Sequence, residues 1–162
     1  KTGQTGVLYQ IRNVLYKERK QQMTDVRDVL CEGCDALYRI DYHYVQGTEM
    51  HGIIVGGNIR CFLKLSGTAY MPDLNGKILL LESRSGTVAR METYLSQLQQ
   101  IGAFEQIAGI LLGTFTEMEA KQCMPDIVQL VKKYVRKTMP IAVTKQIGHG
   151  TDAKGIVIGG EL

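Results

Sequence analysis

The chain has 162 residues, of which 44% are hydrophobic and 22% charged, and its formal net charge is +3. This length fits one domain with enough apolar residues for a core. The weak net charge, with both signs interspersed, argues against a nucleic-acid partner. No apolar run approaches the ~18 residues of a membrane-spanning helix, so we expect no membrane association. The chain begins at Lys1 and stops after a strand-like run, which indicates a piece of a longer protein.

Two of the four cysteines, Cys31 and Cys34, form the motif C-E-G-C. Redox dithiols and half zinc sites use this spacing. Here the pair follows the helical run Asp25–Leu30 instead of opening a helix, and the remaining cysteines and histidines show no second paired spacing. We therefore expect reduced thiols, no metal and no cofactor, in a reducing, cytoplasmic setting. Redox or metal chemistry at Cys31 and Cys34 remains an alternative.

The first forty residues have a mostly helical pattern. Apolar residues recur at three- and four-residue spacing from Val7 to Leu15 and from Val26 to Leu37, which predicts two helices. Gly33 is placed to end the second helix. The aromatic, partly alternating run Tyr38–Val45 suits a strand or an extended connection.

Strands alternate with helices in the rest of the chain. Apolar runs predict strands at 50–55, 77–81, 107–112, 141–144 and 155–158, and amphipathic patterns predict helices at 59–65, 87–101 and from Pro125 to about Lys137. Gly56 and Gly57 are expected to form a tight turn before Asn58, a natural N-cap. This alternation is typical of a layered α/β domain.

Glu82 is the first candidate for a chemical role. It follows the continuous apolar run 77–81, which is typical of a strand covered on both faces. In open α/β sheets, ligands bind at the carboxyl ends of strands. A carboxylate there can accept and orient a histidine N–H group. Many strands end in a charged residue, however, so this signal is weak by itself.

His149 is the second candidate, because Gly148 and Gly150 flank it. Glycines on both sides permit unusual backbone angles and a close approach of a substrate or another segment. An imidazole on such a loop is suited to proton transfer near neutral pH. His43 and His51 lie within strand-like runs and are expected to be structural or surface histidines.

A nucleophile to match this acid and base is missing. The chain has four serines, Ser66, Ser83, Ser85 and Ser96. None lies in a G-x-S-x-G motif, and none combines a strand-to-helix elbow with nearby oxyanion donors. An acid–histidine pair of this kind normally activates a nucleophile. The chain therefore offers an acid and a base without a convincing nucleophile.

Seven segments together carry a resemblance to a known family. They are G-I-I-V-G-G-N-I (52–59), L-S-G-T-A-Y-M-P-D (65–73), G-K-I-L-L-L-E (76–82), L-S-Q-L-Q-Q-I-G-A-F (95–104), G-I-L-L-G-T-F (109–115), I-G-H-G (147–150) and I-V-I-G (156–159). In order and spacing, residues 43–162 resemble the L,D-carboxypeptidases. That family includes muramoyltetrapeptide carboxypeptidases and the microcin C immunity peptidases.

The resemblance implies a two-domain serine peptidase with a Ser–His–Glu triad. Residues 43–162 would be its C-terminal domain, of the swivelling β/β/α type, and residues 1–42 a helical connection from an N-terminal domain that carries the serine. Glu82 matches the triad acid and His149 the base. The implied substrate is a murein tetrapeptide, cleaved before its terminal D-alanine in the cytoplasm during peptidoglycan recycling. The isolated chain would be inactive.

The sequence departs from the family at two points. Ser83 stands where an acidic residue usually follows the triad glutamate, and Tyr42 or Tyr44 replaces a usual tryptophan. These departures leave substrate choice open, so a microcin C immunity-type peptidase acting on a peptidyl-nucleotide remains an alternative. A non-catalytic α/β binding module is another. The surface on which the N-terminal domain would dock could also support a homodimer.

Overall fold

A five-stranded sheet forms the centre of the computed structural model, which describes residues 5–10, 20–151 and 153–162. Its strand order is β2-β6-β5-β4-β3, with β2 antiparallel to β6 and the other neighbours parallel. The strands are β2 (His43–Gln46), β3 (Ile54–Asn58), β4 (Ile78–Ser83), β5 (Gly109–Phe115) and β6 (Ile141–Val143). A separate antiparallel pair joins β1 (Gly6–Leu8) to β7 (Ile156–Ile158).

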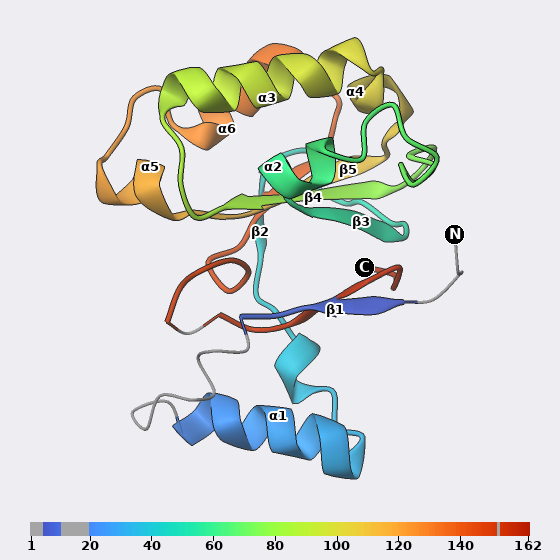
Figure 1. Ribbon diagram of the computed structural model, residues 1–162, viewed down its shortest axis with the longest axis vertical. Helices are drawn as coiled ribbons and strands as arrows, with labels where there is room; N and C mark the ends of the chain where they lie inside the picture. Colours follow the sequence, from blue (N-terminus) through green and yellow to red (C-terminus); the bar gives the residue numbers. More distant parts are fainter. Residues whose placement is uncertain (1–4, 11–19, 152) are drawn as a thin grey trace.

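Helices and the small β1–β7 sheet cover the two faces of the large sheet. The helical elements are α1 (Lys20–Glu32), the 3-10 helix η2 (Ala36–Tyr38), α2 (Ile59–Leu63), α3 (Val88–Gln100), α4 (Ala103–Gln106), α5 (Thr116–Ala120) and α6 (Ile127–Tyr134). Figure 1 shows α3, α4 and α6 above the sheet, β1 below it, and α1 farthest from α3. The domain is therefore a layered, mixed α/β fold.

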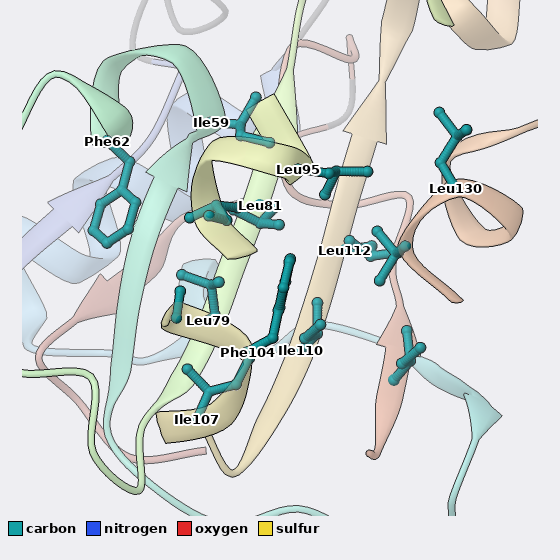
Figure 2. Close-up of a cluster of buried hydrophobic side chains, with 14 of the residues drawn as sticks. Ile59, Phe62, Leu79, Leu81, Leu95, Phe104, Ile107, Ile110, Leu112 and Leu130 are labelled. Atoms are coloured by element: carbon teal, nitrogen blue, oxygen red, sulfur yellow. The ribbon is translucent and has the colours of Figure 1, made fainter. Parts of the chain in front are cut away.

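The continuous apolar run in β4 is buried on both faces of the sheet. Leu79 and Leu81 point toward the helices and join Leu95 of α3 and Phe104 of α4 in one core, as Figure 2 shows. Ile78 and Leu80 belong to a second core on the β1–β7 side. Each buried leucine or isoleucine contributes about 1.5–3 kcal/mol relative to exposure. The expectation of a strand covered on both faces is confirmed.

The helices predicted at 87–101 and 59–65 are observed as α3 and α2, close to the predicted positions. The Thr87 hydroxyl accepts from the Arg90 N–H at 3.4 Å and caps α3, and Asn58 caps α2 through the Cys61 N–H at 3.3 Å. Gly33 follows α1 with φ +67°, the left-handed conformation expected at a helix end. Of the residues that the structure describes, none forms a helix long and apolar enough to cross a membrane.

Three local predictions are wrong. Val7 and Leu8 lie in β1 instead of a helix, because they pair with β7; Ile11, Val14 and Leu15 of the same predicted helix lie outside the described residues. Gly56 and Gly57 belong to β3, not to a turn, with φ values of +115° and +130°. A side chain at Gly56 would collide with the Leu80 carbonyl of β4.

The third correction concerns the start of α6. Pro125 lies before this helix instead of in its first turn, because Asp126 provides the N-cap. The Asp126 carboxylate accepts from the Gln129 N–H at 2.8 Å, while the Gln129 side chain accepts from the Asp126 N–H at 3.0 Å. This capping box satisfies two helix-start groups and fixes the boundary.

Candidate active site

Glu82 lies near the carboxyl end of β4, and only 2% of the residue is exposed. The pairing of β4 with β5 changes register at this point: Leu81 lies opposite Leu112, but Ser83 lies opposite Phe115. The strand β5 therefore contains one extra residue opposite Glu82. Such bulges bend a strand and redirect its side chains. Here the bulge brings β5 against the loop that carries the candidate base.

Gly113, within this bulge, lets three segments approach closely. A Cβ atom at Gly113 would lie 2.6 Å from the Ile147 carbonyl oxygen and 3.1 Å from the Glu82 Cβ atom. Both distances are shorter than ordinary van der Waals contacts, and the first involves backbone. A glycine at position 113 is therefore required for the observed spacing between β4, β5 and the 147–150 loop.

Thr114 holds that loop in place through two hydrogen bonds. Its N–H donates to the Ile147 carbonyl at 2.8 Å, and its hydroxyl oxygen accepts from the His149 N–H at 3.3 Å. Gly148 between them has φ +129°, and a side chain there would collide with the Thr114 hydroxyl. The backbone on either side of Gly148 is thus tied to β5, which places the His149 ring over the end of β4.

The two candidate side chains are in direct contact. His149 Nδ1 lies 2.8 Å from Glu82 Oε2, with side-chain exposures of 22% and 3%. An ionised carboxylate only accepts hydrogen bonds, so Nδ1–H is the donor and Nε2 remains available as a proton acceptor. The structure thus brings together the two residues that the sequence singled out. A buried acid orienting a half-buried imidazole is an arrangement suited to general-base chemistry.

The turn after Glu82 is anchored to α5 by Glu117. The Gly86 N–H donates to Glu117 Oε2 at 2.6 Å, and the Glu117 N–H donates to the Arg84 carbonyl at 3.0 Å. Lys121 Nζ donates to Glu117 Oε1 at 2.6 Å. The Lys121 hydrogen bond, followed by that from Gly86, lowers the pKa of Glu117. Glu117 therefore links the turn beside the candidate acid to a neighbouring helix.

A cavity of about 350 Å³ opens over the Glu82–His149 pair. Residues from β3, β4, α2, α3 and the 147–154 segment line it, together with residues 8–10 at the end of β1. Four cationic side chains lie in this lining, those of Arg60, Arg84, Arg90 and Lys154. Lys154 donates to the Arg39 carbonyl at 2.6 Å. The volume is that of a small-ligand site.

Other candidates from the sequence lie outside this arrangement. Cys31 and Cys34 are free and exposed at the end of α1, and no group of three or more metal-ligating side chains occurs among the described residues. The rings of Tyr42 and Tyr44 meet edge-on at 5.9 Å but do not line the cavity. Ser83, which does line it, donates its hydroxyl to the Ser85 carbonyl at 2.9 Å.

Comparison with known proteins places the chain among carboxypeptidase-like sequences. Residues 51–162 match the family model described as LD-carboxypeptidase C-terminal domain. A predicted carboxypeptidase of Treponema pallidum is 33% identical over 126 residues, covering 75% of this chain and 36% of the relative. The microcin C7 self-immunity protein MccF of Escherichia coli is 30% identical over 78 residues, covering 48% of this chain and 23% of the relative.

Solved structures agree with this placement. An MccF-like protein from Bacillus anthracis matches with a TM-score of 0.63 and 31% identity, covering 74% of this chain and 38% of that one. MccF in complex with glutamyl sulfamoyl guanosine matches with a TM-score of 0.64 at 19% identity, over 76% of this chain and 38% of that one, and this likeness concerns the fold. The chain therefore corresponds to little more than a third of its relatives' length.

Proposed function

The chain belongs to the LD-carboxypeptidase C-terminal domain family, and from this premise we propose that it supplies the acid and the base of a serine L,D-carboxypeptidase. Glu82 and His149 would be two members of a Ser–His–Glu triad. Residues 43–162 would form the swivelling C-terminal domain. The serine and the oxyanion donors would come from the N-terminal part of the full-length protein. The observation that carries this proposal is the 2.8 Å contact between Glu82 Oε2 and His149 Nδ1.

The proposed mechanism assigns one task to each residue. His149 Nε2 takes the proton from the serine as the serine attacks the carbonyl of an L,D-peptide bond. It then returns that proton to the amino group of the leaving D-amino acid. Glu82 holds the ring in the Nδ1–H tautomer and stabilises the imidazolium that forms. Because Glu82 is buried and His149 is partly exposed at the cavity, only the base reaches the reacting atoms.

The test is substitution of each residue in the full-length protein. We expect Glu82→Ala and His149→Ala to lower turnover of a murein tetrapeptide by about 10⁴–10⁶-fold, the loss seen when members of a triad are removed. Release of D-alanine measures the rate. A matched control is His51→Ala, because His51 is exposed and does not line the cavity. Retention of more than about a tenth of the native rate by either triad variant would contradict the assignment.

A second experiment uses the chain as it stands. We expect no release of D-alanine from the tetrapeptide, because the proposed serine is absent. Each of the four serines lies in the described part of the chain, and there the His149 ring hydrogen-bonds to Glu82 and to no serine. Measurable peptidase activity of the isolated chain would overturn the proposed division of the triad between two domains.

The murein peptide is the substrate we propose, in the cytoplasm, and a peptidyl-nucleotide is the alternative. Relatives of the microcin immunity type have been solved with glutamyl sulfamoyl guanosine and with AMP, which favours testing the alternative. Tyr42 and Tyr44, one of which replaces the usual tryptophan of the family, do not line the cavity. Assaying the full-length protein against both substrates decides between them.

A further inference from the structure

Three arginines line the cavity that holds the Glu82–His149 pair. Arg60 lies on α2, Arg84 follows β4, and Arg90 lies in the first turn of α3. Their side chains come from three separate elements that the fold brings to the carboxyl end of the parallel strands. The cavity therefore concentrates positive charge beside the proposed base.

Among the described residues, one carboxylate stands against this positive charge in the cavity lining. None of the three arginines forms an ion pair with another described residue. Glu82 is the only carboxylate among the described lining residues, and it accepts from His149. The positive charge of Arg90 also lowers the pKa of Glu117 on α5. The Glu117 carboxylate, however, already accepts hydrogen bonds from Lys121 and Gly86. An anionic ligand would complete the site.

We propose that Arg60, Arg84 and Arg90 form an anion subsite that binds a carboxylate or phosphate group of the substrate next to the bond that is cleaved. A guanidinium presents a planar fork of N–H donors that matches two oxygens of such a group. The proposal rests on the proposed function. A carboxypeptidase that removes one residue cleaves beside a free carboxylate, so cationic side chains in the cavity that holds the base fit that substrate.

Anion binding can be measured on the chain itself, without activity. We would titrate it with N-acetyl-D-alanine and with the uncharged N-acetyl-D-alanine amide, following backbone amide shifts around the cavity by NMR. We expect the acid to bind at least about ten-fold more tightly than the amide, since hydrogen bonds to a charged group contribute more than neutral ones. AMP and adenosine form the second pair of probes, and preferential binding of AMP would assign the subsite to phosphate.

Single substitutions assign the effect to the arginines. We expect Arg60→Gln, Arg84→Gln and Arg90→Gln each to weaken binding of the preferred anion by about ten-fold, the loss of one charge-assisted hydrogen bond. The control is Arg136→Gln, because Arg136 is exposed and outside the cavity. Equal binding of charged and uncharged probes, or unchanged binding in all three cavity variants, would overturn the proposal.

Kinetics of the full-length protein separate this inference from the proposed function. The subsite predicts a raised KM in the arginine variants with a smaller change in kcat, and the triad predicts loss of kcat in the Glu82 and His149 variants. If only the triad variants lose activity and the arginine variants keep native KM, the anion subsite is wrong and the peptidase stands. If the arginine variants lose anion binding while the triad variants keep turnover, the peptidase proposal fails and the subsite stands.

Discussion

Gly113 is a residue at which three parts of the candidate site come close together. A methyl group there would press on the Ile147 carbonyl and on the Glu82 Cβ atom. The carbonyl is backbone and tied to Thr114, so it cannot rotate away as the end of a side chain could. We expect Gly113→Ala to lower the free energy of unfolding by about 1–3 kcal/mol, the usual cost of overpacking. Urea unfolding followed by circular dichroism measures this loss.

Gly6→Ala is the matched control for that substitution. Nothing lies within 4 Å of a Cβ atom at Gly6, which is exposed in β1. We expect its free energy of unfolding to stay within about 0.5 kcal/mol of the native value. If both substitutions cost the same, the loss at Gly113 reflects glycine replacement in a strand and not the crowded contact with the 147–150 loop.

At the residue scale, the sequence identified the acid and the base of the candidate site but not the residues that hold them in position. Glu82 could be singled out because it ends an apolar strand, and His149 because glycines flank it. Their roles came from the family resemblance. Thr114 and Gly113 gave no comparable signal, because their function depends on the register between β4 and β5, and a bulge opposite Glu82 cannot be read from either strand alone.

At the scale of elements, α5 stabilises the turn after β4 through Glu117. Its hydrogen bonds from Lys121 and Gly86 lower its pKa in the folded protein. A carboxyl group of this kind contributes stability above its unfolded pKa and loses that contribution as the pH falls through its folded pKa. We therefore expect Glu117→Gln to be less stable than the native chain at pH 7. The difference should shrink as the pH is lowered below about 4.5. Urea midpoints across this range measure it.

The control for this pH dependence is Glu161→Gln. Glu161 is exposed and forms no ion pair with another described residue. Its variant should follow the native curve at every pH. A Glu117→Gln difference that is constant from neutral to acid pH would show that the carboxylate charge does not hold the turn.

Elements with a strong local pattern were predicted well, and those formed by distant pairing were not. The amphipathic stripe of α3 and the apolar run of β4 are visible in the sequence, and both elements are found within a few residues of their predicted bounds. By contrast, β1 is three residues long and exists because it pairs with β7, about 150 positions away along the chain. The period of its apolar residues suited a helix, and the tertiary contact decided otherwise.

At the scale of the molecule, the N-terminal segment is packed onto the domain that the resemblance placed at 43–162. β1 pairs with β7, and Leu37 is 4% exposed and lies against Gly155. The buried Gln22 side chain donates to the Ala153 carbonyl at 2.9 Å. These contacts hold the polypeptide that follows His149. The segment thus contributes Leu8 and Ile40 to the second core of the sheet.

Removing residues 1–42 tests whether this segment is part of the folding unit. We expect the 43–162 chain to unfold at a lower urea concentration, with a loss of at least about 2–5 kcal/mol, the cost of losing one buried leucine such as Leu37. Leu37→Ala in the intact chain should cost a similar amount, because the same contact is lost without shortening the chain. Met23→Ala is the control, since Met23 is 49% exposed on α1 and should change stability by less than about 0.5 kcal/mol. Equal stability of the intact and shortened chains would mean that residues 1–42 serve as a connection alone, because the β1–β7 pairing would then add nothing to the fold that positions His149.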